Sequence, residues 1–363
     1  MTDKLMSRFR FCLPAIFIIA AIFLIGCATS LPAGDKLPGK NENGFTYPKY
    51  FEAEFRITID SAKINDSLSV QTANSAIPFG ADPVFRLWIS DFITLPNQKI
   101  TEYTYDGIAP DEVNTDFENG NRISFWDLSR IIGKPQKVVI SRKFSGILYE
   151  YRPELSPKVT LKDYDTTDNR LYYFYTKSEP FLEQTPEIIK LANEIIAGKE
   201  TIKDISASIY NWVYGKMKYV YPPEERGVLG AIKKYEGDCG QYSVLFITLC
   251  RSVGIPARQQ SGFSIEKGGF GYHIWSEIYF PGTGWVPMDA SNKDGYGHIK
   301  NTQLVASTGM NIPLKHIPAW ATYIDQDAQG NRTDFMQFMT TVKSGFSAKI
   351  VTERKLLKLE DLK

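Results

Sequence analysis

Residues 237–258 read GDCGQYSVLFITLCRSVGIPAR, and this stretch decides how the second half of the chain folds. Apolar residues recur along its middle with the spacing of a helix, and Gly254 followed by Pro256 ends that helix. Cys239 is therefore predicted to lie at the helix N-terminus, between two glycines that leave it open to approach. Backbone N–H groups and the helix dipole favour a thiolate there, so the pattern predicts a lowered pKa for Cys239.

The four cysteines of the chain divide into two pairs. Cys12 and Cys27 lie in the N-terminal segment, whereas Cys239 and Cys250 are eleven residues apart on the predicted helix. At a rise of about 1.5 Å per residue they are about 16 Å apart, which excludes a disulfide between them. Cys250 is flanked by apolar residues and is interpreted as core packing. Cys239 is the candidate nucleophile.

His273 is the candidate partner of that thiolate, since a cysteine enzyme needs a group that exchanges protons near neutral pH. It begins the alternating stretch HIWSEIYF, which predicts a strand, and residues 281–284 turn the chain back into GWVPMD. This hairpin brings Asp289 towards His273, where a carboxylate would hold the imidazole in one tautomer. With a simple four-residue loop Asp289 would oppose Ser276 on the wrong face, so the prediction requires a bulge or a shifted turn.

The segments around Cys239, His273 and Asp289 resemble the three signature blocks of the transglutaminase-like superfamily, in the same order along the chain. The resemblance covers about residues 171–310. It implies an α+β, papain-like core in which a helix bearing the cysteine packs on an antiparallel sheet bearing the histidine and the aspartate. It also implies that Cys239 is the nucleophile, His273 the general acid and base, and Asp289 the residue that orients the imidazole. Flanking residues match the blocks as well: Gly237, Arg251, Gly254, Ile255, Pro256, Arg258, Trp275, Glu277, Gly284 and Trp285.

The chemistry that the resemblance implies is acyl transfer through a thioester, on a peptide, protein or glycopeptide substrate. Animal transglutaminases carry Gln before the cysteine and Trp after it, whereas this chain has Asp238 and Gly240, which looks closer to the bacterial, protease-like members. The leading prediction is therefore a cysteine peptidase or amidase. A crosslinking transglutaminase and a non-catalytic module that binds peptide or glycan are the alternatives. The backbone N–H of Cys239 is one oxyanion-hole donor, and the sequence does not identify the second.

The first half of the chain carries no catalytic constellation and predicts a different architecture. Between residues 45 and 170, short runs of β-branched and aromatic residues alternate with turn signals such as Asp106-Gly107. This region is predicted to be a β-rich, sandwich-like domain, and residues 171–363 the transglutaminase-like domain. The C-terminal stretch 351–363 is compatible with a short amphipathic helix and is interpreted as a solvated terminal element.

The N-terminus has the pattern of an export signal, because basic residues precede an uncharged stretch at residues 11–26 that is too short to span a membrane. The residues LIGC at 24–27 resemble a bacterial lipobox, which implies a lipid on Cys27 that would hold the protein at a membrane surface of the cell envelope. An ordinary secretory signal with an incidental cysteine is the alternative. Residues 1–26 are predicted to be a signal peptide, and residues 27–44 a flexible linker.

Charge and residue spacing argue against other kinds of partner. Without residues 1–26 the chain has 39 basic and 40 acidic residues, a net charge of −1. Nucleic-acid binding usually requires a basic excess, so no such partner is expected. Neither a cofactor nor a metal is expected; the acidic stretch at residues 325–330 begins like a calcium loop but is interpreted as a turn. His298 and His316 lie in loop-like stretches and are interpreted as surface residues.

Overall fold

The computed structural model describes residues 43–64, 82–167, 169–266, 268–318, 320–321 and 332–362. The predicted signal peptide, Cys27, most of the predicted linker and the acidic stretch at 325–330 lie outside these ranges. Among the helices of the described ranges, none combines the length and the apolar character that crossing a membrane requires.

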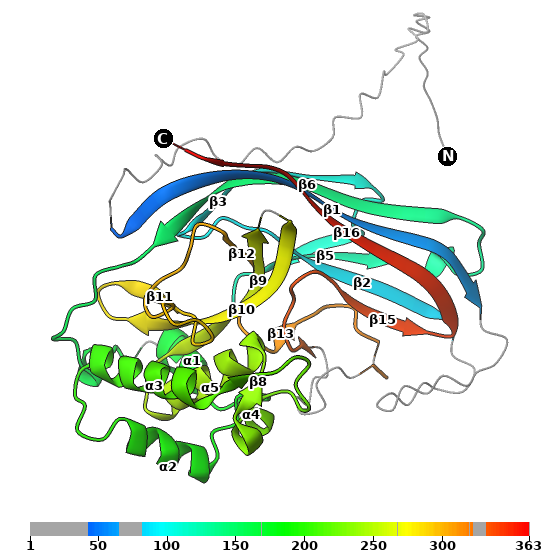
Figure 1. The fold of residues 1–363 in the computed structure, drawn as a ribbon. Coiled ribbons are helices and arrows are strands. Elements are labelled where there is room, and N and C mark those ends of the chain that lie inside the picture. The colour runs from blue at the N-terminus through cyan, green and yellow to red at the C-terminus, as the bar shows by residue number, and fades with distance from the viewer. Residues whose placement is uncertain are drawn as a thin grey trace, which may run out of the picture.

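Two four-stranded antiparallel sheets form a β-sandwich (Figure 1). One sheet has the strand order β16-β1-β6-β3 and the other β15-β2-β5-β4. The strands are β1 Phe45–Ile64, β2 Val84–Asp91, β3 Gln98–Gly107, β4 Glu112–Thr115, β5 Arg122–Asp127, β6 Lys137–Tyr151, β15 Thr340–Ser344 and β16 Phe346–Asp361. The 3-10 helix η1 (Ser129–Ile131) connects β5 to β6.

Alternation of apolar and polar residues along β1 produces one buried face, as expected for a strand with period two. Phe51, Phe55 and Ile57 are at most 1% exposed. They pack against residues of the opposite sheet, including Leu87 of β2 and Trp126 of β5. The prediction that the first half of the chain is β-rich is confirmed.

The C-terminus differs from the sequence expectation. Strand β16 pairs antiparallel with β1, from Lys49 opposite Asp361 to Ile64 opposite Phe346, and β15 pairs with β2. Residues 351–361 are thus neither helical nor a free end; they complete a sheet of the first half of the chain. The sequence of β16 has only a weak pattern of apolar residues, because β16 is an edge strand whose side chains are only partly buried.

The second half of the chain forms an antiparallel sheet of order β11-β10-β9-β12, with helices on the side away from the sandwich (Figure 1). Residues 240–251 of helix α5 are buried, and the helix packs on this sheet among α2, α3 and α4, which confirms the predicted core. The remaining elements, in order, are η2 Leu161–Asp163, η3 Asn169–Tyr173, α1 Phe174–Thr176, α2 Pro186–Ile195, α3 Ile202–Lys216, β7 Lys218–Tyr219, α4 Val228–Lys234, β8 Glu236–Gly237, α5 Cys239–Ser252, β9 Ala257–Glu266, β10 Gly269–Phe280, β11 Gly284–Met288, β12 Gln303–Thr308, β13 Ile312–Pro313 and β14 Arg332–Thr333.

An aromatic cluster around Phe55 joins the sandwich to the second sheet. The ring of Phe55 lies 5.6 and 5.1 Å from those of Phe92 and Phe144 in the sandwich. It lies 5.2 Å from Phe263 of β9 and 4.8 Å from Phe270 of β10. Edge-to-face contacts at these distances are favourable beyond the burial of apolar area. The two halves of the chain therefore share one apolar core.

We expect Phe55→Ala to lower the free energy of unfolding by about 3–5 kcal/mol, because it opens a cavity where the two halves meet. Denaturant unfolding followed by circular dichroism measures the change. Leu357→Ala, at a position 54% exposed on β16, is the control and should stay within about 0.5 kcal/mol of the parent. A loss below about 1 kcal/mol for Phe55→Ala would contradict the shared core.

Candidate active site

Cys239 is the first residue of α5, as the sequence predicts. Its side chain is partly exposed, whereas Cys250 is completely buried, and neither forms a disulfide. Burial raises the pKa of the Cys250 thiol well above its usual value, so that thiol stays neutral. The interpretation of Cys250 as core packing agrees with this position.

The turn that presents Cys239 is fixed by Asp238, the N-cap of α5. One oxygen of its carboxylate accepts a hydrogen bond from the backbone N–H of Gln241 at 3.2 Å. Nη1 of Arg226 donates to both carboxylate oxygens, at 2.8 and 2.7 Å. Gly237 leaves no room for a side chain, because a Cβ there would lie 2.4 Å from Gln241. These contacts hold the first turn of α5 in one position.

The hairpin between β10 and β11 solves the register problem that the sequence raises. Phe280 pairs with Gly284 and Ser276 with Met288, so three residues rather than four form the loop. Gly282 and Gly284 have φ values of +81° and +95°, which glycine adopts without strain. The turn is shifted by one residue from the simple four-residue loop, and Asp289 consequently lies on the same face as His273.

His273 and Asp289 form a close pair. Nε2 of His273 lies 2.8 Å from Oδ2 of Asp289, and their side chains are 19% and 7% exposed. Oδ1 of Asp289 accepts hydrogen bonds from the hydroxyl of Ser291 at 2.7 Å and from its backbone N–H at 3.2 Å. The His273 ring lies nearly parallel to that of Trp275, with centroids 5.8 Å apart. These contacts fix the orientation of both groups.

His273 also hydrogen-bonds the Cys239 side chain, so the structure brings together all three residues that the sequence singles out. Because Nε2 is engaged by Asp289, Nδ1 is the ring nitrogen that remains for the thiol. Burial would lower the pKa of His273, but hydrogen bonds to Asp289 and Cys239 and their negative charges raise it to about 10. The imidazole is therefore protonated at neutral pH.

The pKa of Asp289 moves in the opposite direction. Burial of this carboxyl would raise its pKa, but the hydrogen bond and the charge of His273, together with Ser291, lower it below the usual range. The carboxylate thus stays ionised and can stabilise an imidazolium beside it.

Tyr219 is a site residue that the sequence does not single out. Strand β7 runs parallel to β8, with Tyr219 opposite Gly237, two residues before Cys239. The backbone N–H of Cys239 donates a hydrogen bond to the phenol oxygen of Tyr219. Partial burial and the neighbouring Cys239 and Asp238 raise the pKa of Tyr219, so the phenol keeps its proton. An aromatic residue in this stretch is visible in the sequence, but nothing distinguishes Tyr219 from Tyr221.

The other singled-out residues have structural positions. Glu277 accepts hydrogen bonds from Arg258 and Gln260. Trp275 is completely buried. The interpretation of His298 as a surface residue is wrong: it is 9% exposed, and its Nε2 lies 3.0 Å from Glu150.

The burial of His298 has a tertiary cause. The end of β6 crosses the loop that carries this histidine, with Tyr151 bridged to Ile299. His316, by contrast, is partly exposed; it stacks on Phe125 and lies 2.7 Å from Glu112.

Comparison with known proteins identifies the class of the core domain. Residues 189–290 match the family model of the transglutaminase-like superfamily core, so this part of the chain is a transglutaminase-like domain. It is 23% identical over 320 residues to an uncharacterised protein of Haemophilus influenzae, an alignment that covers 76% of each chain.

Solved structures with a similar fold include one from Cytophaga hutchinsonii whose name calls it a candidate cysteine protease. It superposes with a TM-score of 0.53 at 15% identity and covers 86% of this chain and 92% of its own. The periplasmic domain of TgpA from Pseudomonas aeruginosa has a TM-score of 0.33 at 14% identity, over 66% of this chain and 90% of that one.

Asp289→Asn tests the pair of imidazole and carboxylate. The folded-state pKa of His273, about 10, lies above its ordinary value of 6.5, so the protonated ring stabilises the fold fully below pH 6.5. That contribution is lost as the pH rises through 10. We expect Asp289→Asn to lower the His273 pKa, which NMR titration of the imidazole measures. The free energy of unfolding should then decrease less between pH 6.5 and pH 10 than it does in the parent protein.

Asp294→Asn, at an exposed position of the same loop, is the matched control and should leave the His273 titration unchanged. An unaltered His273 pKa in Asp289→Asn would show that the carboxylate does not hold the proton on the ring.

Proposed function

We propose that this protein is a thiol acyl-transfer enzyme of the cell envelope, a cysteine peptidase or amidase that works through Cys239, His273 and Asp289. The observation that carries the proposal is the continuous hydrogen-bonded series from the Cys239 side chain through His273 to Asp289. Superfamily membership supports it, as does the name of the Cytophaga hutchinsonii neighbour. The substrate is a peptide, protein or glycopeptide.

The reaction begins with attack of the Cys239 thiolate on an amide carbonyl carbon. His273, protonated at neutral pH, then gives its proton to the departing nitrogen as the C–N bond breaks, which leaves a thioester on Cys239. A water molecule attacks this thioester, His273 takes up a proton from the water, and the carboxylic acid leaves as the thiolate re-forms. Asp289 stabilises the imidazolium while it exists.

A polar hollow beside the imidazole supports water as the acceptor. It has a volume of about 670 Å³, and its walls include His273, Ser291, Lys293 and Lys300. Water can therefore approach the ring that must accept its proton. Transfer to an amine would need a site that excludes water, since hydrolysis otherwise competes with it.

Tyr219 is the proposed second donor of the oxyanion hole. Its phenol oxygen now accepts from the Cys239 N–H, so it occupies the place where a substrate carbonyl oxygen would bind. The side chain is 58% exposed and can move aside. A carbonyl oxygen that replaces this contact would accept from the Cys239 N–H and from the phenol O–H together.

Attachment to a membrane through a lipid on Cys27 is part of the proposal. Its support is the lipobox-like stretch at residues 24–27 and the preceding export signal.

Cys239→Ala should abolish hydrolysis of peptide and amide substrates, because no other group can form the thioester. Iodoacetamide at neutral pH should label Cys239 faster than an ordinary exposed thiol and leave the buried Cys250 unmodified, as mass spectrometry of the digested protein would show. Full activity in Cys239→Ala would exclude the mechanism. Incorporation of a labelled primary amine into a glutamine-bearing protein, without hydrolysis, would identify a crosslinking enzyme instead.

Tyr219→Phe should lower kcat by about a hundredfold with little change in KM, because it removes a hydrogen bond made in the transition state. Steady-state kinetics on a peptide that the parent protein hydrolyses measure this. Tyr221→Phe is the matched control, since its side chain is 74% exposed and two residues away, and it should retain the parent kcat. Equal rates for Tyr219→Phe and the parent would remove Tyr219 from the mechanism.

A further inference from the structure

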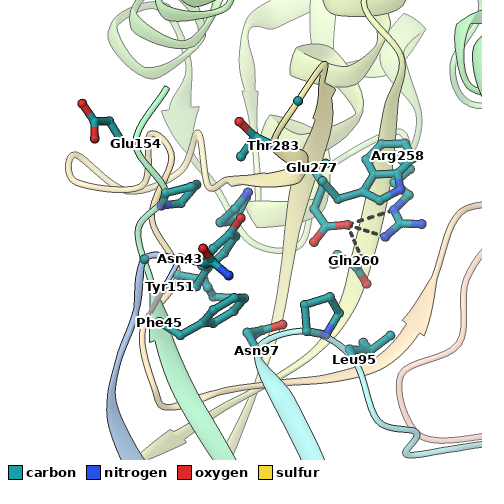
Figure 2. Close-up of a pocket in the computed structure, with 18 residues that line it drawn as sticks. Asn43, Phe45, Leu95, Asn97, Tyr151, Glu154, Arg258, Gln260, Glu277 and Thr283 are labelled. Atoms are coloured by element: carbon teal, nitrogen blue, oxygen red, sulfur yellow. Dashed lines mark hydrogen bonds and ion pairs between the residues drawn. The ribbon is translucent and has the colours of Figure 1, made fainter. Parts of the chain in front are cut away.

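A second pocket lies between the sandwich and the β10–β11 hairpin (Figure 2). It has a volume of about 940 Å³, and Cys239, His273 and Asp289 are not among its lining residues. Its walls come from the start of β1, the loop between β2 and β3, the end of β6 and the hairpin. A volume of this size suits a ligand larger than a single amino acid.

Glu277 presents a fixed acceptor to this pocket. Its Oε2 accepts from Nε of Arg258 at 2.8 Å and from Nε2 of Gln260 at 2.6 Å. Figure 2 shows these two contacts on one side of the carboxylate, with the pocket on the other. No donor among the described residues reaches Oε1. Arg258 neutralises the charge of Glu277, so the pocket presents an oriented acceptor rather than a free anion.

Tyr151 supplies a second unused polar group. Its side chain lines the pocket and is 8% exposed, yet its hydroxyl has no hydrogen-bond partner in the part of the chain that the structure describes. Burial, and then the nearby charge of Glu277, raise the pKa of Tyr151 to about 12, so the hydroxyl stays protonated and can both donate and accept. A hydroxyl that lines a cavity and has no partner among the described residues is available to a ligand.

Aromatic rings give the pocket flat apolar walls. The ring of Tyr151 stacks on that of Phe45 at 4.3 Å, with an interplanar angle of 14°. Trp285 lines the pocket from β11, and Arg258 lies over one face of its indole, 3.9 Å from the ring centroid. The pocket thus combines flat apolar surfaces with a few polar groups in fixed positions.

We propose that this pocket binds a sugar unit of a glycan. The C–H face of a sugar ring packs on an aromatic ring, while its hydroxyls, each a donor and an acceptor, pair with Glu277 and Tyr151. An extended peptide would instead pair with the free edge of β11, but Pro287 in that strand has no N–H to donate. Binding in this pocket goes beyond the proposed hydrolysis and does not depend on it, because Cys239, His273 and Asp289 do not line the pocket.

The test uses the full chain in a Cys239→Ala background, so that turnover does not consume the ligand. Cellotriose and chitotriose are the sugar probes, and trialanine is the peptide probe. Tryptophan fluorescence and calorimetry measure the binding of each probe. At least one trisaccharide should bind with a Kd of about 1 mM or below. Tyr151→Phe should weaken that binding about three- to tenfold, the loss expected for one hydrogen bond.

Tyr149→Phe is the matched control. Tyr149 is on the same strand, its hydroxyl is buried without a partner among the described residues, and it does not line the pocket, so the Kd should not change. Thr283→Trp fills the pocket from the hairpin loop and is expected to abolish binding. It serves as a second variant if thermal melts show that Tyr151→Phe does not fold.

Three results would overturn the proposal. One is the absence of saturable binding of either trisaccharide at concentrations up to about 10 mM. Another is binding that neither Tyr151→Phe nor Thr283→Trp weakens. The third is Tyr151-dependent binding of trialanine without binding of a trisaccharide, which would make the pocket a peptide subsite.

Discussion

The hydrogen bond between His273 and Asp289 is the interaction on which the candidate active site depends. It fixes which nitrogen of the imidazole faces Cys239, and with Cys239 it keeps the ring protonated despite burial. The bond exists only because the β10–β11 loop has three residues, which places Asp289 on the face of His273. A hairpin one residue longer would turn the carboxylate to the other face, since side chains alternate along a strand.

The sandwich contributes to this site although it carries none of the three residues. Gln337, in the segment that leads into β15, donates to the backbone carbonyl of His273 at 3.0 Å and to that of Gly262 at 3.1 Å. Phe55 packs against Phe263 and Phe270 of the same sheet. The strands that bear the imidazole are therefore held between the buried helix α5 and the sandwich core, as a site that must keep its geometry requires.

The two pockets beside the core sheet have different linings because His273 and Glu277, both on β10, face different pockets. Along β10, His273 meets Cys239 at one end, and Glu277 meets Arg258 and Tyr151 at the other. The completely buried Trp275 lies between them. One strand thus carries both residues, and the side chains around each of them decide its environment.

Sequence by itself determined the elements whose physical signals are local. The apolar spacing of α5 and the alternation of β1 and β10 are all set by residues close together in the chain, and so was the candidate set of Cys239, His273 and Asp289. Tertiary structure alone decided the rest: the paired position of β16, the burial of His298, and the contact of Tyr219 with the Cys239 N–H. The physical reason is that these depend on which distant segments become neighbours. An edge strand and a single tyrosine carry too little apolar or charged pattern to specify that neighbour before the chain has folded.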